Sequence, residues 1–428
     1  MLFCKCVHTF SMNWIEKRSQ WLQALWHSFC IVSVLFAVCQ LLRISADLWQ
    51  NPYTAILAQF ADAAEKTAPY WIAFALPYHL LPGTSAFSGV WSAFCFCIYH
   101  SMFTAITGAQ TGILWAILLG LLTVQYTQRA GDKRGRLLSL ITAIILGILF
   151  GLIHKPFEVV CLSLLNKIGN RSTLAGTLYG ILQTLLQPLS ATVNNLIDYH
   201  SPGGAIWTDG KIITGAKNIF HTLPNASAAV LFLAGKGLQL FLVSGFSFAL
   251  SDGCTTRTKY AITVLTVGCL LSGHTELFLL FLLFESPFLF MAFVGLSGVC
   301  YLVASRLSLH WGFLQSGGLT EFLIYNHSGL QPILVGVVFC VLSYFVCRYL
   351  RERYGIAEDV TVRLPKHLQW LVKELGGLQN ICGIENKVVQ VRNAKRINTL
   401  LLEGELKGNQ FISEDKQIQE LKEYLDFS

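Results

Sequence analysis

The sequence predicts an all-α polytopic membrane domain with about 10 transmembrane helices and re-entrant segments, followed by a small α+β cytoplasmic domain. Of the 428 residues, 54% are hydrophobic and only 13% are charged, whereas soluble domains are about 25% charged. The charges gather at the end, because residues 351–428 carry 12 Lys and Arg and 12 Asp and Glu. Apolar segments close to the length of a membrane span, about 20 residues, precede this charged region.

The first transmembrane helix is expected over residues 21–42. Lys17 and Arg18 precede this apolar stretch, and no cleavage site of small residues follows it. Several later segments contain Pro or Gly, which is typical of helices broken around a cavity. These further segments are 68–83, 86–108, 110–127, 137–154, 173–190, 226–250, 260–281, 283–304 and 331–349.

Three basic clusters set the expected orientation. They lie before the first span (Lys17 and Arg18), after the fourth (129–136) and after the tenth (348–353). An even number of spans separates them, so the positive-inside rule predicts that both termini are cytoplasmic. We expect residues 1–350 to form the membrane domain, 351–364 a linker and 365–428 the cytoplasmic domain.

Composition also excludes several functions. A net charge of +7 without a basic cluster interleaved with aromatic residues argues against binding to nucleic acid. Cys4 and Cys6 form a CxC pair, but no His or carboxylate lies close by in the sequence. We therefore expect no metal site and no cofactor.

The cytoplasmic domain shows patterns of both helix and strand. Leu368, Leu371, Val372 and Leu375 follow the spacing of one buried helix face, which Gly376 and Gly377 should end. Val389 and Val391 alternate with more polar neighbours, as in a half-buried strand, and residues 414–424 indicate a second helix.

Within the membrane domain, the polar stretch 191–225 is expected to be a long functional or re-entrant loop.

The strongest candidate site is Gly273-His274-Thr275-Glu276, which lies within an apolar segment. An ionisable residue at membrane depth is costly and indicates a functional site. The alternative is a structural carboxylate paired inside the bundle, a reading that also applies to Glu285. His274 is either a ligand or a core imidazole, and it would point away from Glu276 in a regular helix or strand.

Four motifs in this order resemble the sugar permeases of the phosphotransferase system (PTS), the EIIC subunits of the glucose, N-acetylglucosamine and maltose superfamily. Residues 271–289 resemble the G-I-T-E-P…P-V-L segment, and residues 312–322 are similar to G-F-x-F-S-A-G-L-x-D-Y. Residues 223–226 resemble G-L-P-A/G-A, and residues 375–381 are similar to L-G-G-x-E-N-I, which opens the fused EIIB domain.

The resemblance implies a sugar permease in the bacterial inner membrane that moves a hexose or disaccharide by an elevator-like shift. Its partners would be the sugar, the lipid bilayer, a second copy in a homodimer and a separate EIIB/EIIA phosphocarrier. The resemblance implies that Glu276, at the position of the family's glutamate, accepts hydrogen bonds from sugar hydroxyls. His274 departs from the family's motif, and His221 and Asn225 are candidates because they flank Pro224. The candidates are Glu276, Thr275, Gly273, His274, Asn225 and His221.

Two departures put phosphorylation in doubt. Lys387 stands where the family has its phosphorylated cysteine, and an ammonium group cannot replace a thiolate as phosphoryl carrier. The family has a G-L-H motif before the long loop, and its histidine is absent near residues 190–192. The family's P-I-E segment aligns with residues 277–279, which contain no carboxylate. Sugar phosphotransferase activity is therefore left open. The alternatives are a non-phosphorylating sugar sensor or regulatory paralogue and an unrelated secondary transporter.

Overall fold

The computed structural model divides the chain into two compact units, which are described separately. One unit comprises Met1–Leu250 and Tyr260–Arg348, and the other comprises Ser251–Lys259 and Tyr349–Ser428. The structure describes residues 2–49, 51–81, 85–168, 173–189, 205–208, 210–223, 227–252, 254, 256–309, 311, 317–325, 329–354, 366–376, 380–385, 388–391, 393–394, 397, 402, 404–408, 410–413, 417–419 and 421.

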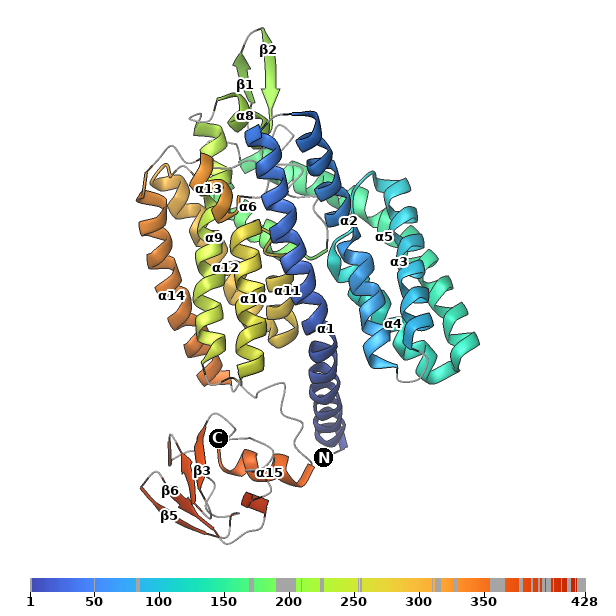
Figure 1. The fold of residues 1–428 in the computed structure, drawn as a ribbon, viewed down its shortest axis with the longest axis vertical. Helices are drawn as coiled ribbons and strands as arrows, with labels where there is room; N and C mark the ends of the chain where they lie inside the picture. The colour runs from blue at the N-terminus through green and yellow to red at the C-terminus, as the bar shows by residue number, and fades with distance from the viewer. Residues whose placement is uncertain are drawn as a thin grey trace. The chain divides into compact units, whose positions relative to one another are not determined.

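The first unit is built mainly from helices, shown from blue to orange in Figure 1. Among the described residues, five helices are long and apolar enough to cross a membrane, and they lie within α1, α3, α5, α12 and α14. The expectation of a multi-pass helical membrane protein is confirmed, whereas the count of ten spans stays a prediction. The helices are α1 (Leu2–Trp49), α2 (Pro52–Leu80), α3 (Ser85–Thr107), α4 (Ile113–Ala130), α5 (Asp132–Ile168), α6 (Thr173–Leu186), α9 (Ser227–Ser251), α10 (Thr256–Ser272), α11 (Glu276–Glu285), α12 (Pro287–Arg306), α13 (Leu319–Tyr325) and α14 (Gln331–Tyr354).

Helix α2 begins well before the apolar segment expected at 68–83. Asn51 caps it: its side chain accepts a hydrogen bond from the Thr54 amide at 2.9 Å, and the Thr54 hydroxyl accepts one from the Asn51 amide at 3.1 Å. Pro52 occupies the first helical position, where its missing N–H costs nothing. The helix that begins at this cap includes the charged residues Asp62, Glu65 and Lys66, which hydropathy alone had left out.

Two polar contacts join α1 to α13. The buried carboxylate of Glu321 accepts a hydrogen bond from the Gln40 amide and another from the backbone N–H of Gly317 at 2.8 Å. The Tyr325 hydroxyl donates to Asp47. These contacts satisfy a carboxylate that would otherwise be costly to bury.

The stretch expected as a polar loop at 191–225 contains regular structure. An antiparallel hairpin pairs β1 (Ala205–Thr208) with β2 (Lys211–Thr214), and α8 (Ala216–Thr222) follows it. Gly210 turns the hairpin with a positive φ of 74°, which glycine adopts without strain. The membrane domain is therefore not all-α, which corrects the expectation for this stretch; residues 190–204 lie outside the described part of the chain.

The second unit includes a small α+β module at its C-terminal end. Its antiparallel sheet has the order β3-β4-β6-β5, formed by Ile381–Glu385, Val388–Val391, Gln410–Ile412 and Glu405–Lys407 in that spatial order. Helix α15 (Lys366–Glu374) precedes the sheet. Gly376, which has a φ of +89°, follows the end of this helix. Of the second helix expected at 414–424, residues 417–419 are helical and most others lie outside the described residues.

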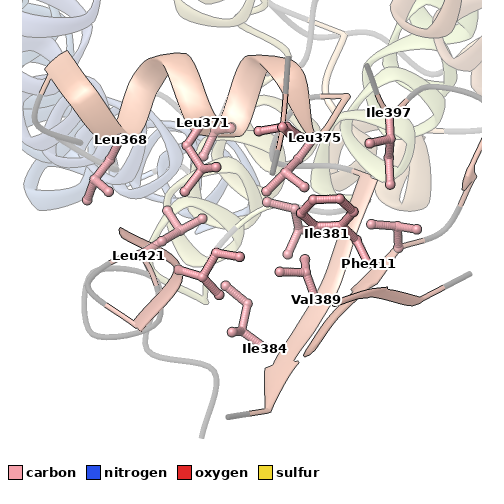
Figure 2. Packing of buried hydrophobic residues seen from close by; sticks show 13 residues of the cluster. Leu368, Leu371, Leu375, Ile381, Ile384, Val389, Ile397, Phe411 and Leu421 are labelled. Carbon is pink, nitrogen blue, oxygen red and sulfur yellow. The ribbon is translucent and has the colours of Figure 1, made fainter. Parts of the chain in front are cut away.

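Figure 2 shows how this module buries its core. The predicted helix face is confirmed, since Leu368, Leu371 and Leu375 are each no more than 1% exposed and lie against the sheet. Val389 and Val391 are buried from β4 as predicted, and Phe411 joins them from β6. Both patterns could be read from the sequence because each element has one apolar face.

Candidate functional site

The site begins at a break between α10 and α11. The segment expected as one span at 260–281 is two helices, because α10 ends at Ser272 and α11 begins at Glu276. Gly273 sits between them with a φ of +77°, and its amide donates to the Cys269 carbonyl at 2.8 Å. The Ser272 hydroxyl accepts a hydrogen bond from the His274 amide at 3.2 Å, which holds the connection in place.

His274 belongs to an ionic network with α1 and α2. Its Nε2 lies 2.9 Å from Oε1 of Glu65, and the other oxygen of Glu65 contacts the guanidinium of Arg43. The same guanidinium donates through Nε to Oδ1 of Asp62 at 2.7 Å. The Phe36 ring packs on the imidazole with ring centroids 4.9 Å apart. Arg43 thus compensates the carboxylate of Glu65, which is only 21% exposed and would be costly to bury alone.

Thr275 and Glu276 face the end of α6. The Thr275 hydroxyl donates to Oε1 of Gln187 at 3.3 Å, and Gln187 and Glu276 line the same cavity. Glu276 is half-buried at the first position of α11, where the helix dipole favours a negative charge.

A second polar network orients amide side chains on neighbouring helices. Gln239 of α9 donates to the Thr184 hydroxyl at 2.8 Å and also to Ser297. The Tyr301 hydroxyl donates to Oε1 of Gln183 at 2.8 Å. Because their partners fix them, Gln239 and Gln183 present their amides in defined directions.

Members of both networks border one cavity of about 790 Å³. Its lining includes Arg43, Asp62, Glu65, Gln183, Gln187, Gln239 and the whole 273–276 connection, together with the aromatic rings of Phe36, Tyr70 and Phe96. This volume lies within the range of about 300–1,000 Å³ that is usual for small-molecule sites. The lining combines carboxylates, amides, hydroxyls and aromatic faces, which suits a polyhydroxylated ligand.

Some of the site residues predicted from the sequence line the cavity and others do not. Gly273, His274, Thr275 and Glu276 line the cavity together. The expectation that His274 would point away from Glu276 is wrong, because the connection is not helical and both residues line the same cavity; even in an extended segment, residues two apart share a face. His221 is exposed on α8 and is not among the described lining residues. Asn225 and Lys387 lie outside the described residues.

Sequence reasoning missed Arg43, Asp62 and Glu65. A signal existed, because Asp62 and Glu65 are spaced i and i+3 in an otherwise weakly charged region, and this spacing puts both on one helix face. The position of Arg43 near the end of the first apolar stretch gave a second signal. Neither signal reveals the partner, since His274 comes from a distant part of the chain.

The apolar helices and the internal cavity define a multi-pass membrane protein with a cavity lined by charged, amide and aromatic side chains. No family model matches the chain. The chain is similar to the "PTS system glucoside-specific EIICBA component" of Staphylococcus carnosus (strain TM300), with 23% identity over 340 residues, covering 68% of this chain and 48% of the relative. The chain spans about half the length of this curated relative. The resemblance to a PTS EIIC of the glucose superfamily with a fused B-like tail is thereby confirmed.

Proposed function

We propose that the chain is a sugar permease of the PTS EIIC type, which binds a hexose or disaccharide in the cavity beside His274 and Glu276. The observation that carries the proposal is the convergence of residues 273–276 with Gln183, Gln187 and Gln239 on one cavity. Sugar hydroxyls both donate and accept hydrogen bonds, so they need acceptors such as carboxylates together with amides that do both. The relative named above is described as glucoside-specific, which supports a sugar as the ligand.

Glu276 is the residue we assign to sugar hydroxyl binding. A carboxylate accepts two hydrogen bonds, and such bonds are strong when one partner is charged. Glu276 is the first residue of α11 and follows the interruption between α10 and α11 at Gly273. Its carboxylate therefore faces the cavity and does not pack along a helix. His274 and Thr275 would contact the same ligand from the preceding connection.

Phosphorylation of the sugar would depend on a separate EIIB, itself phosphorylated by an EIIA. Lys387 occupies the position aligned with the family's phosphocysteine, and lysine cannot perform that transfer. We further propose that the protein works in the bacterial inner membrane as a homodimer, with both termini cytoplasmic. The distribution of basic residues supports the orientation.

Lys387 also favours a second function, that of a non-phosphorylating sugar sensor or regulatory paralogue. A tail that keeps its folded core but has Lys387 in place of the cysteine suits a role in binding partners. In that case the cavity would bind sugar without vectorial uptake.

Proteoliposomes containing the full chain test these functions. Labelled sugars would be added with phosphoenolpyruvate and the soluble phosphotransfer proteins, in parallel with and without a separate EIIB. We expect uptake, and sugar phosphate only when EIIB is present. Sugar binding without uptake or phosphate would favour the sensor, and the absence of any sugar binding would exclude both. Protein-free liposomes and the Gly295→Ala variant, at a helical position open to an added Cβ, are the controls.

A further inference from the structure

Two buried hydroxyl groups hold the side chain of Gln239 in the cavity wall. Thr184 of α6 is 1% exposed and Ser297 of α12 is fully buried, and their hydroxyl oxygens lie 2.7 Å apart. Nε2 of Gln239, on α9, donates to Thr184 at 2.8 Å and also to Ser297. Three helices therefore meet at one carboxamide that borders the cavity.

Glycines let α6 and α12 come close enough for the two hydroxyls to touch. A Cβ at Gly180 would lie 2.4 Å from the Tyr301 ring, and a Cβ at Gly298 would lie 2.7 Å from the Ile181 side chain. Small residues at helix contacts permit such close packing in membrane domains. The packing of two helices thus fixes the hydroxyls, and a fixed support orients the amide that it contacts.

The hydrogen atoms of this group decide which end of the Gln239 amide faces the hydroxyls. Each hydroxyl has a single proton. The Gly180 carbonyl accepts from Thr184 at 2.7 Å and lies 3.3 Å from the Ser297 hydroxyl, and the contact between the two hydroxyls also needs a proton. Both protons are therefore used within the group. Because none is left for a carbonyl oxygen, the amide presents its N–H groups to the hydroxyls.

This orientation leaves Oε1 as the polar atom of Gln239 that is available to the cavity. Within the part of the chain that the structure describes, no group donates to Oε1, and this oxygen is not wholly buried. A carbonyl oxygen accepts hydrogen bonds and cannot donate them. The carboxamide thus offers an acceptor at a fixed place in the cavity wall.

We propose that Gln239 is a specificity-determining residue whose Oε1 accepts a hydrogen bond from one hydroxyl of the sugar, and that Thr184 and Ser297 are positioning residues that hold it there. The inference rests on the proposed sugar-binding function and deepens it, because the sugar must carry a free hydroxyl at that carbon. A site built to bind a hydroxyl rejects analogues that lack it, since its own polar group is then left unpaired.

Titration of the purified full chain with modified sugars tests the direction of this hydrogen bond. Glucose and maltose are the parent probes, and in each analogue one hydroxyl is replaced by hydrogen or by fluorine. Neither replacement can donate a hydrogen bond, but fluorine is still a weak acceptor. At the carbon that Gln239 contacts, we expect both analogues to bind about tenfold more weakly than the parent sugar. The fluoro analogue should bind no better there than the deoxy analogue.

Gln239→Met identifies this carbon. Removal of the amide should abolish the difference between parent and analogues at one carbon and leave the differences at the other carbons unchanged. Thr184→Val combined with Ser297→Ala removes both hydroxyls and frees the amide to turn its N–H groups toward the ligand. In this double variant the fluoro analogue at that carbon should bind about threefold or more tightly than the deoxy analogue.

Two further variants separate positioning from a general effect on folding. Thr184→Ser keeps the hydroxyl and should preserve the affinities of the unmodified chain. Ser139→Ala is the matched control, because the Ser139 hydroxyl is also buried and donates at 2.8 Å to the carbonyl four residues earlier. It lies on α5 and is not among the described lining residues, so the ratio of fluoro to deoxy affinity should stay unchanged.

The outcomes separate this inference from the proposed function. Tighter binding of the fluoro than of the deoxy analogue to the unmodified chain would show that Gln239 donates, and an equal loss for every sugar in Gln239→Met would show that it contacts no hydroxyl. Either result overturns the inference and leaves the proposed function standing, whether or not the double variant folds. A folded double variant with the unmodified ratio would overturn the positioning role. Failure of both parent sugars to bind would overturn the proposed function, and the inference with it.

Discussion

The imidazole of His274 and the carboxylate of Glu65 lie 2.9 Å apart, and this contact joins the connection after α10 to the middle of α2. Arg43 of α1 contacts the same carboxylate and Asp62 as well. Three distant segments therefore meet in one ionic network at the wall of the cavity. The network fixes both the packing of the helices and the position of a candidate ligand-binding side chain.

This network should contribute strongly to stability. We expect Arg43→Met to destabilise the protein by about 1–3 kcal/mol, because it leaves the partly buried carboxylate of Glu65, 21% exposed, without its charged partner. Arg43→Met combined with Glu65→Gln should be less harmful than the sum of the two single variants. Thermal and denaturant unfolding in detergent would measure the free energies.

The i,i+4 pair of Arg136 and Asp132 on α5, with 25% and 39% of the two side chains exposed, is the comparison pair. Arg136→Met should cost about 1 kcal/mol, because an i,i+4 ion pair contributes little and the contact of the guanidinium with the Phe87 ring adds a small cation–π contribution. If Arg43→Met and Arg136→Met lower the free energy of unfolding equally, the Arg43 network stabilises the protein no more than an ordinary helix ion pair does.

The conformation of Gly273 gives a prediction about the backbone. Gly273→Ala should destabilise the fold by roughly 1–2 kcal/mol, since a positive φ is costly for residues with a Cβ. Gly295→Ala in α12, where an added Cβ meets nothing within 4 Å, should be neutral or slightly stabilising. Unfolding of both variants, followed by sugar titration, makes the comparison. If Gly273→Ala leaves the free energy of unfolding and the sugar affinity unchanged, glycine is not required between α10 and α11.

Glu276 should carry a large share of sugar binding. We expect Glu276→Gln to weaken it by about 1.5–3 kcal/mol, the usual contribution of a hydrogen bond to a charged group, while the protein still folds. The ligand-induced shift in melting temperature in detergent measures this. Glu352→Gln, exposed on α14, controls for a general change of charge. Unchanged affinity in folded Glu276→Gln would make Glu276 a structural carboxylate.

The C-terminal module should not accept a phosphoryl group. A lysine with an ordinary pKa of about 10.4 is protonated at neutral pH and has no lone pair for the transfer. Incubation of the full chain with labelled phosphoenolpyruvate and the soluble phosphotransfer proteins should therefore give an unlabelled band. A label that survives Cys382→Ser and disappears in Lys387→Ala would overturn the prediction.

The basic clusters predict that both ends of the chain face the cytoplasm. A reporter active only in the periplasm, fused after Ser428, should show no activity, and the same reporter fused before Met1 should also stay inactive. A cytoplasm-active reporter at each position confirms expression. Strong periplasmic activity at Ser428 would contradict an even number of spans.

Much of the architecture was predictable because it follows from local patterns. Leu368, Leu371 and Val389 each lie on an apolar face that the sequence displays directly, and all three are buried. Hydropathy also located the long helices, but it failed where polar residues continue a helix. The start of α2 depends on the Asn51 cap, and the hairpin at 205–214 has no long apolar signal.

The sequence by itself determined a membrane protein with an α+β tail and the candidate residues 273–276, and the family resemblance gave the expectation that Lys387 stands at the position of the phosphocysteine. Composition, periodicity and motif order are properties of neighbouring residues, so they can be read without a fold. Only the tertiary structure brought Glu65 to His274 and placed Gln187 and Gln239 at the same cavity. These residues come from helices far apart in the chain, and helix packing, not local sequence, decides which of their faces meet.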